Sequence, residues 1–204
     1  MADDARALWD DIYADGQQMN KAPFDEVISF VYRNQPDKDP HQIRILEVGC
    51  GVGNNIKHFA REGYKCSGID GSHDAVQLAC EGMARIPSYE VFQGDFRTLP
   101  WGMHSFDLVI DRAALWYVDR IGARRALSEI HRVMNTGGRL LFTPCRKNID
   151  HRTGTIRFDT AKQAMALLSE ERWKIISFDR VDIWDISKGY KIRSSHFRIV
   201  AEKK

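Results

Sequence analysis

Three glycines and two carboxylates are the residues of this chain whose types and spacing could do chemistry. Gly49, Gly51 and Gly53 follow an apolar run in alternate positions, and glycine allows backbone torsions and a close ligand approach that a Cβ would block. Glu47 stands just before them, where its carboxylate could accept a hydrogen bond from an ammonium group. Asp70 ends a second apolar run, the position from which a carboxylate can take both hydroxyls of a ribose. The pattern predicts a site for a zwitterionic nucleoside.

A nicotinamide dinucleotide fits this loop less well. The dinucleotide fingerprint is G-x-G-x-x-G, whereas here the third glycine comes one residue early, at Gly53, and Asn54 stands where the fingerprint has glycine or alanine. The Glu47 carboxylate would also repel a pyrophosphate. The spacing therefore disfavours NAD as the ligand.

The glycine loop needs a strand before it and a helix after it. Residues 43–48 form an apolar run that suits a strand buried on both faces. Residues 54–62 place Ile56, Phe59 and Ala60 on one helical face, which predicts a helix whose free first-turn N–H groups point into the loop. Such a helix start is a binding site for an anionic or polar ligand group.

These residues resemble a known family. The segment 47–53, Glu-Val-Gly-Cys-Gly-Val-Gly, together with Asp70, is similar to motif I and the following acidic position of the class I S-adenosylmethionine-dependent methyltransferases. The resemblance continues through 93–96, 106–111 and 137–142, in the family's order and with its approximate spacing, and covers nearly the whole chain. It implies an α/β fold, namely a Rossmann-like, doubly wound, mostly parallel seven-stranded sheet with an antiparallel last strand and an N-terminal helical lid.

The resemblance also implies the ligand and its site. S-adenosyl-L-methionine would be the cofactor and S-adenosyl-L-homocysteine the product. Asp95 would reach the exocyclic amine of adenine, and Phe96 would lie against the base. The carboxylates of Glu47, Asp70, Asp95 and Asp111 are expected to converge on one crevice, at the reversal of strand order. The expected cofactor-binding residues are Glu47, Gly49, Cys50, Gly51, Gly53, Asp70, Gly71, Ser72, Asp95, Phe96, Asp111, Arg112, Trp9 and Tyr13.

Length and composition agree with a single domain that spans 1–204. With 204 residues, of which 43% are hydrophobic and 28% charged, the chain can bury a substantial core without a disulfide or metal to hold it. Within the domain, residues 1–41 are expected to form the helical lid and residues 42–204 the Rossmann-like core. The lid precedes the first strand and is therefore available to cover the carboxyl edge of the sheet.

Two helices are expected in the lid. Apolar residues at helical spacing predict one helix over 5–13, ended by Gly16, and a second from Pro23 onward. In the family that the chain resembles, such a leader often covers cofactor and substrate. Trp9 and Tyr13 could equally be core packing, since an aromatic stripe at helical spacing is usually core.

The rest of the pattern alternates helices and strands. Ser72 and Asp119 suit N-caps, Asn135–Gly137 suits the end of a helix, and a capping box begins at Thr160. Two loosely alternating runs joined by Ser187–Gly189 predict a closing hairpin. The expected elements are helices over 72–87 and 119–137 and one starting at 160, and strands at 64–70, 89–92, 106–110, 139–143, 173–186 and 190–201.

Cysteine usage and charge indicate the cellular setting. The four cysteines show no C-x-x-C pairing and are expected to be reduced, with no disulfide and no metal site. The amino terminus lacks the apolar core of a signal peptide, and no apolar run is long enough to span a bilayer. With a formal net charge of +2 and no long run of like charges, the chain is expected to be cytoplasmic, a monomer or homodimer, and to bind neither nucleic acid nor membrane.

The implied cofactor determines the chemistry. Its sulfonium activates the methyl group for in-line displacement, so the protein would mainly hold a nucleophile about 3 Å from that methyl. An amine or alcohol acceptor would also need a proton acceptor, for which Asp111, Tyr13 and His151 are candidates and none stands out. The polar, basic loop 147–157 is expected to form one wall of the substrate site. The expected substrate contacts are Trp116, Tyr117, Arg146 and His151.

The class of acceptor is inferred from absences. The fourth strand is not followed by Asn-Pro-Pro-Tyr or Asp-Pro-Pro-Tyr, the tetrapeptide with which base-amino nucleic-acid methyltransferases grip a planar amine. A small-molecule acceptor that reacts through O, N or S is therefore expected. Methyl transfer to a protein or RNA, and a sensor that binds S-adenosylmethionine without catalysis, remain alternatives. An aminopropyl transferase is disfavoured, because its acidic amine-binding motifs are not evident.

Overall fold

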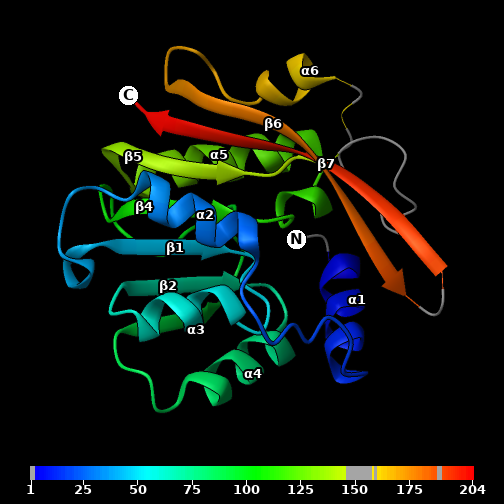
Figure 1. Cartoon of the computed structure of the whole chain (residues 1–204). Coiled ribbons are helices and arrows are strands. Elements are labelled where there is room, and N and C mark those ends of the chain that lie inside the picture. Colours follow the sequence, from blue (N-terminus) through cyan, green and yellow to red (C-terminus); the bar gives the residue numbers. More distant parts are fainter. Residues whose placement is uncertain (1–2, 146–157, 159, 188–189) are drawn as a thin grey trace.

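The computed structural model, which describes residues 3–145, 158, 160–187 and 190–204, has one seven-stranded sheet with helices on both faces (Figure 1). No helix in this part of the chain is long and apolar enough to cross a membrane. The strands are β1 (Arg44–Val48), β2 (Lys65–Asp70), β3 (Tyr89–Gln93), β4 (Phe106–Asp111), β5 (Met134–Phe142), β6 (Trp173–Ser187) and β7 (Tyr190–Lys203). The helices are α1 (Asp3–Ala14), α2 (Asp25–Asn34), α3 (Asn54–Arg61), α4 (His73–Met83), α5 (Arg120–Val133) and α6 (Ala161–Met165), with 3-10 turns η1 (Pro40–Gln42) and η2 (Leu115–Tyr117).

The strand order β3-β2-β1-β4-β5-β7-β6 positions the site. The pairs among β1 to β5 are parallel, while β7 is antiparallel to both β5 and β6. The predicted Rossmann-like, mostly parallel sheet with an antiparallel last strand is thereby confirmed. The chain runs outward from β1 to β3 and then returns to β4, so the carboxyl ends of β1 and β4 are neighbours, with Val48 paired to Asp111. Ligands of open α/β sheets bind in the crevice at such a reversal.

Each face of the sheet carries its own hydrophobic layer. Leu46 and Val48 of β1 belong to the layer under α5 and α6, and Ile45 belongs to the layer under α2 and α3. These β1 side chains are buried on both faces, as expected for a central parallel strand. The most buried strands therefore hold the glycine turn and its neighbouring carboxylates on a rigid base.

The two leader helices occupy different places. α1 lies at the carboxyl edge of the sheet, away from the sheet's faces (Figure 1). α2 packs against β4 and β5 and buries Val27, Phe30 and Val31 in the same layer as Ile45. α1 is thus the part of the leader that covers the crevice, whereas α2 belongs to the core and brings its first turn to the crevice.

The boundary between α5 and β5 differs from the prediction. α5 ends at Val133, and Asn135–Gly137, expected to end that helix, lie inside β5. The Asn135 side-chain amide donates to Asp107 Oδ1 at 3.0 Å, which holds this segment beside β4. Gly137 has φ +77°, a left-handed torsion that is common in glycines at helix ends. In this chain it occurs within β5, whose pairing with β4 is irregular.

The helix after β2 begins where predicted and ends earlier. The Ser72 hydroxyl accepts from the Ala75 amide at 3.2 Å, which confirms the N-cap. α4 ends at Met83 and does not reach Pro87. Because the residue before a proline is driven out of the helical region, the chain needs the intervening residues to turn toward β3.

A long hairpin closes the sheet. β7 pairs with β5 through residues 199–202, and beyond that contact β6 and β7 continue together past the carboxyl end of β5, on the side of α1 (Figure 1). The hairpin is confirmed, while two residues of its expected turn, 188 and 189, lie outside the described residues. The residues of β7 near 199, where its pairing with β5 begins, therefore lie beside the carboxyl end of β5.

Candidate active site

The glycine turn connects the ends of β1 and β2. The amides of Gly49 and Cys50 both donate to the Ile69 carbonyl, at 2.7 and 3.2 Å. Gly49 has φ +67° and Gly51 has φ +54°, left-handed torsions that favour glycine. A Cβ at Gly51 would lie 2.7 Å from the Tyr13 hydroxyl, so the absence of a side chain lets the lid approach the turn. α3 starts directly after this turn and turns its first N–H groups toward it.

Asp70 ties the glycine turn to the start of α4. Its buried carboxylate accepts from the Gly51 amide at 2.8 Å and from the Ser72 amide at 2.9 Å. A carboxylate offers about four lone-pair positions, so these two bonds leave capacity for hydroxyl donors. The residue is positioned both to shape the loop and to accept from a ribose.

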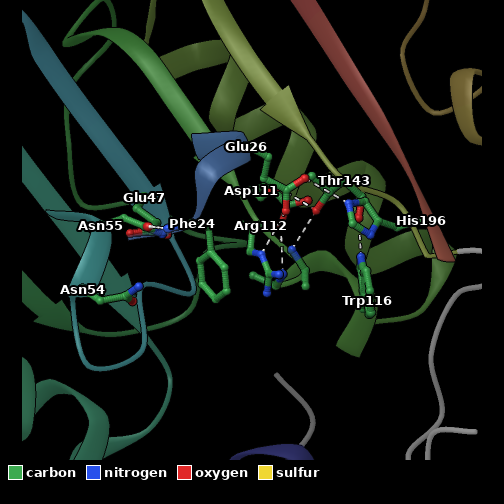
Figure 2. Close-up of polar contacts among 12 residues, drawn as sticks. Phe24, Glu26, Glu47, Asn54, Asn55, Asp111, Arg112, Trp116, Thr143 and His196 are labelled. Carbon is green, nitrogen blue, oxygen red and sulfur yellow. Dashed lines mark hydrogen bonds and ion pairs between the residues drawn. The ribbon is translucent and has the colours of Figure 1, made fainter. Parts of the chain in front are cut away.

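Glu47 presents an unpaired carboxylate oxygen inside the protein. The residue is 3% exposed; Oε1 accepts from the Asn55 side chain at 2.7 Å, and Oε2 is buried with no hydrogen-bond partner in the described structure (Figure 2). Burial raises the pKa of this carboxyl to about 8, although the Asn55 hydrogen bond and the Arg112 charge lower it. An ammonium group would satisfy the free oxygen and stabilise the ionised form.

Asp111 supports the loop that follows β4. It is 0% exposed, and Oδ1 accepts from the amides of Ala114 and Leu115 at 3.1 and 2.9 Å. Burial raises the pKa of this carboxyl to about 7, although backbone N–H groups, first that of Leu115, lower it. Asp111 therefore fixes the loop backbone from the inside, and its carboxylate, which was expected to converge on the crevice, is fully buried.

The aromatic residues of α1 cover the turn. Tyr13 is buried with its hydroxyl over Gly51, and its ring lies 5.6 Å from that of Trp9. Trp9 in turn meets Tyr117, edge to face, at 5.0 Å between centroids. These rings connect α1 with the loop after β4. The contacts favour a role for Trp9 and Tyr13 in covering the site over a role in core packing alone. Burial, followed by the nearby Asp70 charge, raises the pKa of Tyr13 far above its ordinary value, so its phenol stays neutral and is a poor proton acceptor.

Two expected cofactor residues are used for other contacts. The Ser72 hydroxyl donates to Asp10 Oδ1 of α1 at 2.5 Å while it caps α4, so it anchors the lid. The Cys50 side chain is buried in the layer under α3, against Gly68. Cys50 contributes only its backbone to the glycine turn. Ser72 contributes its backbone amide, which donates to Asp70. Gly71, between Asp70 and Ser72, is also buried.

The two residues expected to contact adenine after β3 make other contacts within the protein. Phe96 is buried in the hydrophobic layer under α5, so its ring packs in the core and does not offer a face to an adenine. Both oxygens of Asp95 accept from the Arg97 side chain, at 2.6 to 3.0 Å. Burial opposes ionisation of Asp95, but the Arg97 hydrogen bonds outweigh it and hold the pKa well below its usual range.

The expected substrate residues divide into three groups. Trp116 is buried and donates from Nε1 to the Thr143 carbonyl, so it packs inside the loop. Tyr117 is half-buried and touches the lid through Trp9. Arg146 and His151, like the basic loop 147–157, lie outside the described residues.

A charged cluster that the sequence did not reveal borders the same crevice. Glu26 of α2 accepts from Arg112 Nε at 3.1 Å, and its second oxygen lies 3.0 Å from His196 Nε2 of β7 (Figure 2). The Arg112 guanidinium stacks 3.5 Å above the Phe24 ring. Arg112, expected to contact the cofactor, is thus held by α2. No local pattern could have indicated this cluster, because Glu26 and His196 are 170 residues apart.

Comparison with known proteins identifies the family. Residues 46–142 match the family model described as a methyltransferase domain. The phthiotriol/phenolphthiotriol dimycocerosates methyltransferase of Mycobacterium leprae is 31% identical over 129 residues, which are 62% of this chain and 46% of the relative. Residues 46–142 thus match a methyltransferase domain, and the chain is similar to class I S-adenosylmethionine-dependent methyltransferases. The chain spans about half the length of the curated relatives that it matches.

Solved structures show the same fold as this methyltransferase. An S-adenosylmethionine-dependent methyltransferase from Methanosarcina mazei superposes with a TM-score of 0.71 at 23% identity, covering 89% of this chain and 98% of the other. The magnesium protoporphyrin IX methyltransferase of Synechocystis, solved with bound S-adenosylmethionine, gives 0.70 at 17% identity, covering 98% and 95%. At 23% and 17% identity the likeness supports the fold alone. Any statement about the chemistry must therefore rest on the side chains described above.

The site of this methyltransferase fits S-adenosylmethionine. The unpaired Glu47 Oε2 could accept from the methionine ammonium, and Asp70 could accept from the ribose hydroxyls. Gly49, Gly51 and Gly53 leave the turn free of side chains, with positive φ at each. The polar groups that the ligand requires are therefore present in one crevice.

The raised pKa of Glu47 predicts that ligand-free methyltransferase loses stability as the pH rises. With a pKa of about 8 in the folded protein against 4.5 ordinarily, the carboxyl keeps a proton on folding that the unfolded chain has lost. The associated stability is full below pH 4.5 and is lost as the pH rises to 8. Between pH 6.5 and 8 we expect the free energy of unfolding to fall by about 1 to 2 kcal/mol, since one proton changes it by about 1.4 kcal/mol per pH unit. Urea unfolding at a series of pH values measures this.

Variants at two glutamates test the assignment. Glu47→Gln removes the Glu47 titration and should make the pH dependence in this window less steep, leaving the part that belongs to Asp111, whose pKa of about 7 lies in the same window. Glu81→Gln, at an exposed position of α4, should leave it unchanged. An equally steep dependence in Glu47→Gln would show that Glu47 does not titrate between pH 6.5 and 8.

Proposed function

We propose that this chain transfers the methyl group of S-adenosylmethionine to a small-molecule acceptor that binds between α1 and the loop after β4. When bound, S-adenosylmethionine supplies a methyl group already activated by its sulfonium, so no enzyme nucleophile is needed. The residues of the chain act by binding, orientation and exclusion of water, and a positioned intramolecular reaction can gain several orders of magnitude in this way.

The observation that carries the proposal is the aromatic closure of the crevice. Tyr13 lies over the glycine turn, Trp9 packs on Tyr13, and Tyr117 meets Trp9 from the loop after β4. α1 is held in this place by the hydrogen bond between Asp10 and Ser72. A site closed by aromatic rings on the carboxyl edge suits a compact, largely apolar acceptor better than a nucleic-acid strand, which requires a broad basic face.

The similar proteins agree with an acceptor of this kind. By their names, the mycobacterial relative acts on phthiotriol and phenolphthiotriol dimycocerosates, and the Synechocystis protein acts on magnesium protoporphyrin IX. Neither name is that of a protein or a nucleic acid. We infer for this chain a small acceptor with an apolar body, held by the lid and presented to the methyl group through an O, N or S atom.

The proposal predicts turnover with a small acceptor and a specific dependence on the lid. Isothermal calorimetry should show binding of S-adenosylmethionine and S-adenosylhomocysteine but not NAD. A panel of phenols, alcohols, amines, thiols and carboxylates should include one that yields S-adenosylhomocysteine. Tyr13→Ala should slow this turnover by about 10-fold, more than it weakens cofactor binding, because the lid orients the acceptor. The matched control is Tyr32→Ala, an exposed tyrosine of α2, which should keep full turnover.

The alternatives predict different destinations for a radiolabelled methyl group in a cell extract. Label in RNA or protein, with none in the small-molecule fraction, would overturn the proposal in favour of a macromolecular acceptor. Binding of S-adenosylmethionine with no labelled product of any kind would indicate a sensor.

A further inference from the structure

A buried histidine at the crevice has one ring nitrogen bound and the other without a partner. His196, on β7, is 2% exposed, and its Nε2 lies 3.0 Å from Glu26 Oε2 (Figure 2). Nδ1 is buried and makes no hydrogen bond within the described structure. Because leaving a buried polar atom without a partner is costly, such an atom can mark a place where a ligand or water binds.

Glu26 determines which nitrogen carries the proton. Burial by itself would raise the pKa of the Glu26 carboxyl, but the hydrogen bond with His196 and the charge and hydrogen bond of Arg112 lower it below its ordinary value. The carboxylate is then ionised at neutral pH and can only accept hydrogen bonds. Nε2 of His196 must therefore donate to it, and in the tautomer that carries its proton on Nε2 the other nitrogen, Nδ1, has a lone pair.

The ring stands beside the loop after β4, next to which the proposed function places the acceptor. His196 forms a β-bridge with Cys145 at the end of β5, and its ring centroid lies 5.9 Å from that of Trp116. Trp116 belongs to the same loop as Tyr117, which meets the lid. Arg112, which shares Glu26 with His196, directly follows Asp111. The imidazole thus adjoins the loop after β4, across from the glycine turn.

We propose that His196 is the general base of this methyltransferase, that Glu26 is its positioning residue, and that the acceptor is an alcohol or phenol. The proposal rests on the proposed function and narrows it to an acceptor oxygen that is protonated at neutral pH. The acceptor O–H bond breaks, its proton goes to Nδ1, and an oxygen electron pair forms the bond to the methyl carbon while the C–S electron pair stays on sulfur. The resulting imidazolium is stabilised by the Glu26 carboxylate and afterwards releases its proton to solvent.

A purely structural role for the pair makes a different prediction. If Glu26, His196 and Arg112 only fix α2 to the sheet, their loss should affect stability and every acceptor alike. A general base, in contrast, matters in proportion to how firmly the acceptor holds its proton. The acidity of the acceptor therefore separates the two roles.

The kinetic test compares acceptors of graded acidity. His196→Gln keeps an amide donor facing Glu26 but has no base at the Nδ1 position. We expect turnover of alcohols and of phenols with a pKa near 10 to fall at least about 100-fold, and the loss to shrink to a few fold for nitrophenols and thiols that are ionised at the assay pH. His131→Gln is the matched control, because His131 is also packed against a tryptophan with a buried, unpaired Nε2, but on α5. An equal loss for all acceptors would overturn the proposal.

A second test does not depend on turnover. Nitrogen-15 NMR should show His196 protonated at Nε2 in the wild-type protein, and an added phenol with S-adenosylhomocysteine should shift the Nδ1 resonance. Glu26→Gln should yield a mixture of tautomers, while His196→Gln should bind S-adenosylhomocysteine within about twofold of wild type. A proton on Nδ1, or no response to the phenol, would contradict the assignment. If the wild-type protein methylates nothing, the proposed function fails, and the NMR result still decides whether His196 accepts from a hydroxyl.

Discussion

Alanine at position 49 is expected to lower the free energy of unfolding by about 2 to 5 kcal/mol. Gly49 has φ +67°, a torsion that costs an L-residue about 1 to 2 kcal/mol. Its new Cβ would lie 2.3 Å from the Ala114 Cβ, which adds an overpacking cost of about 1 to 3 kcal/mol. Ala114 cannot easily retreat, because its amide donates to the buried Asp111 carboxylate at 3.1 Å. Urea unfolding measures the loss.

Two further variants separate strain from collision. Gly137→Ala meets a similar torsion, φ +77°, with no atom within 4 Å of the new Cβ, so it should cost only about 1 to 2 kcal/mol. Ala114→Gly in the Gly49→Ala background should recover about 1 to 3 kcal/mol, because it removes the colliding atom. If Gly49→Ala and Gly137→Ala cost the same, the loop after β4 does not press on the glycine turn.

Replacing Asp70 by alanine should weaken binding of S-adenosylhomocysteine by about 1.5 to 3 kcal/mol, or roughly 10- to 150-fold. The carboxylate ends β2 at the crevice and can accept from ribose hydroxyls. It also accepts from the amides of Gly51 and Ser72, so its loss loosens the turn that the ligand must contact. Calorimetry on the folded variant measures the change.

Two other aspartates serve as comparisons. Asp74→Ala, at a partly exposed position in the first turn of α4, should leave the affinity unchanged. Asp95→Ala should weaken binding less than Asp70→Ala does, because Arg97 already occupies both oxygens of Asp95. An unchanged affinity in folded Asp70→Ala would remove Asp70 from the ribose site, and a full loss in Asp95→Ala would restore the adenine role that the sequence suggested.

The sequence by itself determined the frame of the site. The run of β1, the glycine turn and the start of α3 are encoded by neighbouring residues, because burial on both faces, left-handed torsions and the apolar face of a helix each leave a local pattern. Asp70 follows from the same frame, since parallel strands end at one edge of the sheet. The order of further motifs then indicated the family, and with it the seven-stranded sheet.

Only the tertiary structure decided how polar groups around this frame are paired. Arg97 donates to both oxygens of Asp95, and the Ser72 hydroxyl donates to Asp10. The Asn135 side chain donates to Asp107, and the residue lies in β5 instead of ending α5. Glu26 and His196 meet although 170 residues separate them. Helix and strand periods specify which face a residue occupies, but the partner across that face depends on how distant elements pack together. The candidate base therefore became visible only where α2, β4 and β7 converge.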